Sequence, residues 1–387
     1  MDRFKILKFL SHNLLATKGT FDIPQQKQEY YLWKLKEPKD TIERSYLQYK
    51  CQFYFVPAWR RLLLNTMSLF VIWIWILKMF FCKKEKKESV EAIIGTKGYR
   101  EKIIPPSFEK RFNQIQEVDW TEGSYISMWD WNFLFVIAKR YPMSGWFLLK
   151  NFMRISNYSF IIEQYNPQFI IDDNESSFTS SMLTEYCRKK GIRHIDIMHG
   201  EKLYNIRDSF FEFDEIYVWD EHYIRLFQKL RAKTNQYHIE LPPAILIDAE
   251  KFRREDCYCD LKYYATYQTK DELRQIRKIF DVIESKGLKC CLRLHPRYSD
   301  VDVVKQYFRQ DQMEASYFTI EESLVNCRYV VGLYSTVLLQ GYYIKKELIL
   351  DDVVYGETLK KLYEYDYLLL SKPYRLLSEF ISTNNQS

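Results

Sequence analysis

The feature that most restricts the fold is an alternation, beginning near residue 160, of short apolar runs with segments of helical spacing. The runs typical of buried strands are 169–171, 194–198, 215–219, 263–266, 289–294, 329–333 and 347–350. Helical segments such as 179–190, 223–232 and 270–285 separate them. Short apolar runs that alternate with helices predict parallel sheets covered by helices.

A proline-rich joint divides this alternation into two blocks. Pro242-Pro243 and the charged run 251–256 have the composition of a linker. We therefore predict an α/β protein with two Rossmann-like lobes that face a cleft. The expected divisions are an N-terminal, partly hydrophobic helical extension (1–88), a first lobe (89–245) and a second lobe (246–387).

The most apolar stretch of the chain lies in the predicted extension. Residues 62–82 are about as long as a membrane span, which takes roughly 20 residues. Arg60 and Arg61 precede the stretch, and a lysine cluster within 83–87 follows it. Two interpretations stay open: a helix that dips into or spans a membrane with basic flanks on anionic lipid, or a buried helix of the first domain.

Charge and cysteine usage exclude several classes. The formal net charge of +6 suits anionic substrates or a lipid surface but is too weak to predict nucleic-acid binding. The 8 cysteines lack zinc-site spacing, and no secretory signal is visible, so we expect reduced thiols in the cytoplasm. The sequence has no P-loop and no Gly-x-Gly-x-x-Gly, and no Asp-x-Asp at a first-lobe strand end. We therefore expect no metal and no dinucleotide cofactor.

Basic and hydroxyl side chains end two strands of the second lobe. Arg293, His295 and Arg297 alternate at the end of one strand, and two guanidinium groups with an imidazole suit a phosphate. A solvated loop whose histidine caps a carbonyl would also explain them. Ser335 and Thr336 lie between a strand and a helix, where the first-turn amides bind anions. Helix capping alone also accounts for these residue types.

Acidic and histidine side chains end two strands of the first lobe. His199 precedes Gly200, and imidazole exchanges protons near neutral pH, so His199 is a candidate general base. Asp172 and Asp173, followed by Glu175, could supply a carboxylate base instead. The structural alternatives are an ordinary loop histidine and a helix N-cap region.

His-Gly in the first lobe, His-Pro in the second and Ser-Thr before a helix occur in an order that resembles bacterial glycosyltransferases with the two-lobed GT-B fold. These make capsule and surface polysaccharides and include polysialyltransferases. The order is also similar to that of the teichoic acid poly(glycerol phosphate) polymerases. The resemblance covers roughly residues 160–352. It implies that His295 and Ser335-Thr336 hold the phosphate of a cytidine nucleotide and that His199 takes part in catalysis. The acidic motif of the polysialyltransferases ends in glycine, so the departure at Asp172-Asp173-Asn174 argues against a sialyl donor.

Together these features predict a metal-independent inverting glycosyltransferase of bacterial surface or capsular polysaccharide synthesis. A nucleotide-activated sugar, for example CMP- or CDP-linked, would bind the second lobe, and a glycan or lipid-linked acceptor the first. The enzyme would be cytoplasmic, at the inner face of the cell membrane. The alternatives are a CDP-polyol phosphotransferase that transfers glycerol or ribitol phosphate, and a catalytically inert, membrane-associated assembly partner with the same fold.

Overall fold

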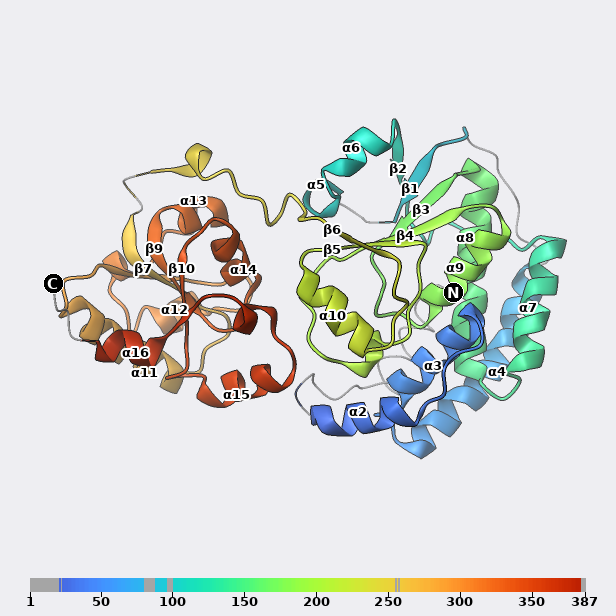
Figure 1. Ribbon diagram of the computed structural model, residues 1–387, viewed down its shortest axis with the longest axis horizontal. Helices are drawn as coiled ribbons and strands as arrows, with labels where there is room; N and C mark the ends of the chain where they lie inside the picture. The colour runs from blue at the N-terminus through green and yellow to red at the C-terminus, as the bar shows by residue number, and fades with distance from the viewer. Residues whose placement is uncertain are drawn as a thin grey trace. The chain divides into compact units, whose positions relative to one another are not determined.

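The computed structural model describes residues 21, 23–79, 88–95, 100–254, 256 and 258–383. The chain folds as two compact units (Figure 1). The N-terminal unit contains the described residues up to His199 together with Tyr204–Pro242. The C-terminal unit contains Gly200–Leu203 and the described residues from Pro243 onward.

The N-terminal unit is built on a six-stranded parallel sheet of order β2-β1-β3-β4-β5-β6. Its strands are β1 (Ala92–Ile94), β2 (Ile115–Glu117), β3 (Phe169–Asp172), β4 (Arg193–Ile197), β5 (Glu215–Val218) and β6 (Tyr237–Ile239). The chain adds β2 on one side of β1 and then all later strands on the other side. This reversal between β1 and β3 is a topological switch point, where α/β sheets bind ligands beyond the strand ends.

Helices cover this sheet. They are α2 (Gln25–Lys34), α3 (Thr41–Phe53), α4 (Ala58–Met79), α5 (Arg100–Ile103), α6 (Ser107–Arg111), α7 (Met128–Arg140), α8 (Gly145–Tyr165), α9 (Thr179–Lys189) and α10 (Glu221–Lys229), with the 3-10 turn η2 (Ile206–Asp208). α8 is the centre of the core, because Phe147, Ile155 and Tyr158, which lie on one face of the helix, are fully buried. The start of α7 is fixed by a capping box between Ser127 and Asp130.

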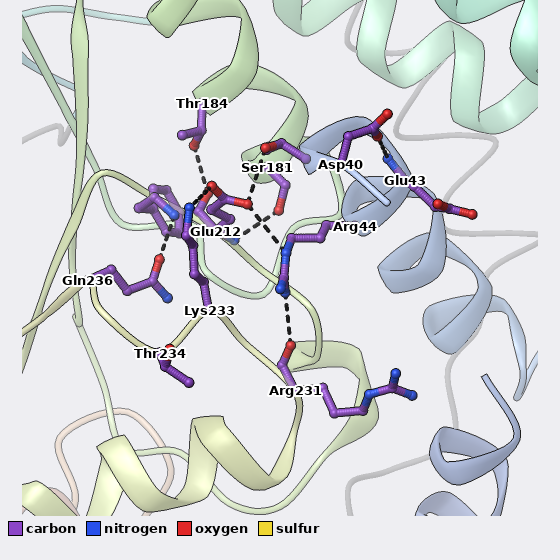
Figure 2. A network of polar contacts seen from close by, with 12 residues as sticks. Asp40, Glu43, Arg44, Ser181, Thr184, Glu212, Arg231, Lys233, Thr234 and Gln236 are labelled. Atoms are coloured by element: carbon purple, nitrogen blue, oxygen red, sulfur yellow. Dashed lines mark hydrogen bonds and ion pairs between the residues drawn. The ribbon is translucent and has the colours of Figure 1, made fainter. Parts of the chain in front are cut away.

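A buried carboxylate ties the N-terminal helices to the sheet (Figure 2). Glu212 accepts hydrogen bonds from Arg188 at 2.6 Å and from Lys233 at 2.7 Å. Arg44 of α3 lies 3.3 Å from the same carboxylate. Burial raises the pKa of Glu212, but Lys233 and Arg188 lower it more, so the group stays ionised. α3, which lies within the segment 1–88, is therefore packed into the N-terminal unit.

α4 corresponds to the apolar stretch noted in the sequence. By length and composition alone, residues Ala58–Leu77 are sufficient to cross a membrane. Of the most apolar 18 residues in this range, 22% are buried inside the protein. The helix packs against α8, and Leu64 and Ile72 are part of the core. Residues 80–82, which end the predicted hydrophobic segment, and the lysine cluster within 83–87 lie outside the described residues.

The C-terminal unit repeats the same winding in a five-stranded parallel sheet of order β11-β10-β9-β7-β8. Its strands are β7 (Cys259–Tyr264), β8 (Cys290–Arg293), β9 (Cys327–Gly332), β10 (Glu347–Leu350) and β11 (Arg375–Leu376). The helices are α11 (Lys270–Glu284), α12 (Val301–Val304), α13 (Ile320–Val325), α14 (Thr336–Tyr343), α15 (Gly356–Glu364) and α16 (Leu377–Ser382), with 3-10 turns η3 (Glu250–Phe252), η4 (Gln310–Gln312) and η5 (Leu368–Ser371). The predicted fold class, two parallel-sheet α/β units with a partly apolar N-terminal helix, is confirmed.

One prediction about the cysteines is wrong. Cys259 of β7 and Cys291 of the neighbouring strand β8 form a disulfide, with their Cα atoms 6.1 Å apart. Cα atoms on adjacent strands lie within the range that a disulfide can join. The prediction of reduced thiols therefore fails for this pair, whereas Cys51, Cys187 and Cys327 are free and buried.

Candidate functional site

Two groups of polar side chains lie at carboxyl ends of strands, one in each unit. In the C-terminal unit the switch point lies between β7 and β9, so the loops after these two strands start side by side. Ser335 follows β9, and Thr266 follows β7. The loop after β8 contacts the loop after β7, because the Ser299 hydroxyl donates a hydrogen bond to the Thr266 carbonyl at 2.9 Å.

His295 is held in one orientation at the end of β8. Its Nδ1 accepts a hydrogen bond from the Arg297 amide at 3.1 Å, and its ring stacks on Tyr298 with the centroids 4.4 Å apart. The His295 amide in turn donates to the Ser299 hydroxyl at 3.0 Å. Because Nδ1 is an acceptor, the neutral ring carries its proton on Nε2. His295 therefore presents an N–H donor while it is uncharged.

The electrostatic surroundings favour this neutral form. Partial burial, together with the nearby Arg297 guanidinium, lowers the pKa of His295 below the ordinary histidine value. Protonation would also require Nδ1 to give up the hydrogen bond from the Arg297 amide. The imidazole is thus a neutral hydrogen-bond donor at neutral pH, suited to a phosphate oxygen.

The structure separates the two arginines of this motif. Arg293 donates to Glu314 at 2.9 Å and to the Phe318 carbonyl at 2.7 Å, inside a network that also holds buried Lys262 2.6 Å from Glu314. Arg297 is exposed. Arg293 is thus committed to the internal structure of the unit, and Arg297 is the cation available for an anionic ligand.

Ser335 and Thr336 begin α14. The Ser335 side chain accepts from the Val337 amide at 3.3 Å, so it is the N-cap of the helix. Thr336 is the first residue of the helix and is exposed. This cap engages the Val337 amide, and the Leu338 amide donates to the Ser335 carbonyl at 3.0 Å, so the helix start offers an anion chiefly the positive end of its dipole. Ser335 therefore caps the helix, and the attraction of this end for an anion comes from the dipole.

Sequence reasoning did not single out a set of tyrosines at the same edge. Each follows the carboxyl end of a neighbouring strand and is exposed: Tyr267 after β7, Tyr298 after β8 and Tyr334 after β9. Aromatic rings at such positions can stack on a planar base or pack against a sugar. Their signal in the sequence is a tyrosine two to five positions after each strand, which is hard to see among 31 tyrosines.

In the N-terminal unit, Asp172 ends β3 and is completely enclosed. It accepts from the Tyr158 hydroxyl at 2.8 Å, the Asp173 amide at 2.9 Å and the Asn174 side chain at 2.5 Å, and Arg154 lies 3.4 Å away. Burial raises its pKa, but Arg154 and these hydrogen bonds lower it more. An enclosed carboxylate of low pKa is a poor proton acceptor, so this geometry favours a role in shaping the loop.

The loop after Asp172 is fixed by the next strand. Asp172 pairs with Asp196 in the register of β3 and β4. Asp196 accepts a hydrogen bond from the Asn174 amide at 2.9 Å. Asp173 is only partly buried and receives the Asn174 side-chain amide at 3.2 Å. This loop carries the chain to Glu175, which is fully buried.

His199 follows β4 beside that carboxylate. Its Nδ1 lies 4.0 Å from the Glu175 carboxylate, and its side chain is 44% exposed. The end of β4 is anchored because the Trp219 indole donates to the Met198 carbonyl at 3.0 Å. A partly exposed imidazole with Nδ1 toward a buried carboxylate has the arrangement of an oriented general base. Such contacts are often long before a substrate binds.

Two cations on α8 also lie near this loop, and sequence reasoning missed them. Lys150 and Arg154 are four residues apart, so they project from the same face of the helix. The Lys150 amine lies 4.9 Å from the Phe178 ring centroid. Burial and the neighbouring Arg154 lower the pKa of Lys150 to about 8. The pattern was hidden because both residues lie within a mostly buried helix and belong to no motif.

Among the described residues, no group of three or more His, Cys, Asp or Glu side chains is arranged to hold a metal ion. A surface cavity lined by Gln164, Gln168 and Lys190, among others, lies at the amino ends of β3 and β4. It is therefore on the edge of the sheet opposite His199 and takes no part in this site.

The sequence matches no protein-family model and no curated protein. Solved structures with a similar fold include the wall teichoic acid polymerase TagF, with 8% identity and a TM-score of 0.41 over 76% of this chain and 79% of that chain. The glycotransferase of kitacinnamycin is similar at 9% identity and a TM-score of 0.44, covering 77% and 92% of the two chains. A third is the UDP-GlcNAc 2-epimerase from Neisseria meningitidis bound to UDP-GlcNAc, at 9% identity and a TM-score of 0.41 over 68% and 82%. At this distance no residue role is carried over to this chain.

Proposed function

We propose that this protein is a metal-independent inverting glycosyltransferase that uses a nucleotide-activated sugar. The observation that carries the proposal is the arrangement at His295, a neutral N–H donor held between Arg297 and Tyr298 at the carboxyl edge of a doubly wound sheet. Together with the start of α14, it offers hydrogen bonds and positive charge to a phosphate. A nucleotide diphosphate or monophosphate ester has the matching chemistry.

The N-terminal unit would bind the acceptor and supply the base. In the proposed step, His199 takes the proton of the acceptor hydroxyl at the nitrogen remote from Glu175. The hydroxyl oxygen forms a bond to the anomeric carbon, and the bond from that carbon to the phosphate oxygen breaks. The nucleotide leaves with the bonding electron pair, and the anomeric configuration inverts because a single displacement occurs.

Stabilisation of the leaving phosphate would fall to the C-terminal unit. Charge grows on the phosphate oxygens as the bond breaks, and fixed donors oriented in advance stabilise that charge without reorganising. Here the donor is His295, and the positive charge comes from Arg297 and the first turn of α14. The buried Glu175 would stabilise the imidazolium that forms on His199.

Ligand binding and product analysis test this proposal. Thermal-shift measurements with CMP, CDP, UDP and GDP should identify a nucleotide that raises the melting temperature by several degrees, since a ligand at 100 times its Kd adds about 2.7 kcal/mol. The donor that it names is then supplied with candidate glycan acceptors. Phosphorus NMR of the product distinguishes release of nucleotide from formation of a phosphodiester. A phosphodiester would mean a CDP-polyol phosphotransferase, and stabilisation by no nucleotide would mean an inert partner.

A matched pair of histidine variants tests the base. H199N should lower kcat by roughly 10²- to 10⁴-fold, the usual contribution of a general base. H238N is the control, because His238 has a similar side-chain exposure of 49% but lies on the edge strand β6. Equal kcat values for the two variants would remove His199 from the mechanism.

A further inference from the structure

α4 presents two different faces. The inner face, made of Leu64, Ser68, Ile72, Trp75 and Met79, is buried in the N-terminal unit. Its members recur every three or four positions, as one side of a helix requires. α4 and α8 are close neighbours, and the ring of Trp75 packs near Phe152 of α8 at 5.8 Å.

The opposite face is a continuous apolar strip, which we call the outer strip. Its apolar side chains are between 37% and 71% exposed and include two tryptophans: Trp59, Leu62, Leu63, Met67, Phe70, Trp73, Ile74 and Leu77. These positions also recur at helical spacing, and no charged residue occurs from Leu62 to Leu77. From Trp59 to Leu77 the strip is roughly 27 Å long, at about 1.5 Å per residue. A contiguous exposed surface of this kind marks an interaction site.

The strip has almost no capacity for hydrogen bonding. Its one other member, Thr66, donates its hydroxyl to the Leu62 carbonyl at 3.0 Å within the helix. The remaining polar groups are the indole N–H groups of Trp59 and Trp73. Tryptophan favours the boundary between acyl chains and headgroups, where the ring is buried and the N–H meets a polar partner.

Hydrogen bonds and close backbone packing hold α4 against its neighbouring helices. The Asn65 side-chain oxygen accepts from the Tyr49 hydroxyl and from the Trp146 amide, each at 3.1 Å. The two backbones touch, since a Cβ added to Gly145 would lie 2.1 Å from the Asn65 carbonyl oxygen. A membrane-spanning α4 would break these contacts and expose the buried face of α8. The helix therefore meets a lipid surface while it stays packed.

The neighbouring helix α7 widens the apolar surface. Trp131 of α7 lies against Trp75 of α4, with the ring centroids 6.1 Å apart, so the two helices are side by side (Figure 1). α7 exposes Phe135 and Val136. Arg60 and Arg61 lie at the beginning of α4 and would meet anionic headgroups.

We propose that the outer strip of α4 inserts into one leaflet of a lipid bilayer, with the helix parallel to the membrane plane and α8 on the side away from the lipid. A lipid surface fits better than a protein partner, because acyl chains need no hydrogen bonds and the strip offers none except at its tryptophans. Electrostatic attraction to anionic headgroups adds to the apolar contact. This membrane contact does not depend on the transfer chemistry proposed above.

Flotation of the full-length protein with vesicles tests the proposal. Vesicles of phosphatidylcholine with about 30% phosphatidylglycerol should carry the protein upward, and pure phosphatidylcholine should carry less. The triple variant F70S/W73S/L77S should bind at least about tenfold more weakly. Its control, I239S/V282S/Y317S, replaces exposed apolar residues elsewhere and should bind like the unaltered protein. Circular dichroism melting shows that both variants keep the fold.

A second measurement determines the orientation of the helix. Interfacial binding predicts that brominated lipids quench tryptophan fluorescence more strongly from shallow than from deep positions, and that alkaline carbonate extracts the protein. Resistance to carbonate with deep quenching would instead show a spanning helix and overturn the proposal. Unchanged vesicle binding by the triple variant would also overturn it. A dimer that the triple variant dissociates, without vesicle binding, would assign the strip to a second copy of the chain.

Discussion

The hydrogen-bonding geometry of His295 leads to a prediction that separates its two nitrogens. In H295N the amide oxygen can still accept from the Arg297 amide, as Nδ1 does at 3.1 Å, but no atom replaces Nε2. In H295Q the side-chain amide nitrogen reaches the Nε2 position, but the acceptor at Nδ1 is lost. H295N therefore removes the hydrogen-bond donor to the phosphate, whereas H295Q removes the acceptor that holds the Arg297 amide.

The expected loss in H295N follows from a single hydrogen bond to a charged group. Such bonds contribute about 1.5–3 kcal/mol, which corresponds to roughly 10- to 150-fold in affinity. Because the His295 ring is only partly buried, we expect the lower part of this range. H295Q should lose less than about tenfold, since it keeps a donor near the same place.

Isothermal titration calorimetry with the nucleotide found in the thermal-shift panel provides the assay, at pH 7.5 and constant ionic strength. Affinity should stay constant between pH 7 and 8.5, because the lowered pKa of His295 keeps the ring neutral throughout. An H295N variant that binds as tightly as the unaltered protein would refute the phosphate assignment. Weaker binding by H295Q than by H295N would show that the turn, and not the donor, controls affinity.

Three further predictions concern stability. E314Q should lower the free energy of unfolding of the C-terminal unit by about 3–5 kcal/mol, because the fully buried Lys262 loses its charged partner. Urea unfolding measures this loss, and a value below about 1 kcal/mol would contradict the importance of the ion pair. Burial lowers the pKa of His194 to about 4, so between pH 6.5 and 4 only the unfolded chain takes up the proton, and stability should fall by about 2 kcal/mol from pH 7 to 5. H194Q should abolish that part of the pH dependence in guanidinium unfolding, and an unchanged slope would assign it to other groups. G145A should cost about 3 kcal/mol by forcing α4 away from α8, whereas G356A, where an added Cβ meets nothing within 4 Å, should leave the melting temperature unchanged.

The arrangement of elements was largely predictable because most strands of the two sheets are short apolar runs between turn signals. The predicted strand 169–171 is β3, and the predicted helix 270–285 is α11, which ends one residue earlier. The edge strands β2, β6 and β11 escaped notice, since three-residue or shorter strands with one exposed side carry little periodicity. Pairing through space defines them, and one sequence does not show it.

The candidate sites were predictable by position but not by role. Asp172, Asp173, His199, His295 and Ser335 all lie at strand ends or helix starts, as the sequence indicated. Their partners come from distant parts of the chain, so the sequence could not distinguish a group bound internally from one that remains available.

Arg293 and Arg297 show this limit most clearly, because in the sequence they are equivalent neighbours of His295. A carboxylate twenty-one positions away, Glu314, engages the first and leaves the second exposed. The tautomer of His295 likewise depends on a backbone amide whose direction only the folded turn determines.

The sequence by itself determined that this chain forms two wound α/β units and that polar motifs follow particular strands, because strand length, helical periodicity and turn residues are local properties. The tertiary structure decided which side of α4 is buried, since the centre of that helix, residues 69–77, is apolar on every side and only its packing on α8 distinguishes an inner face from the outer strip. It also decided which charges remain available to a ligand, since pairing depends on contacts between residues far apart in the chain.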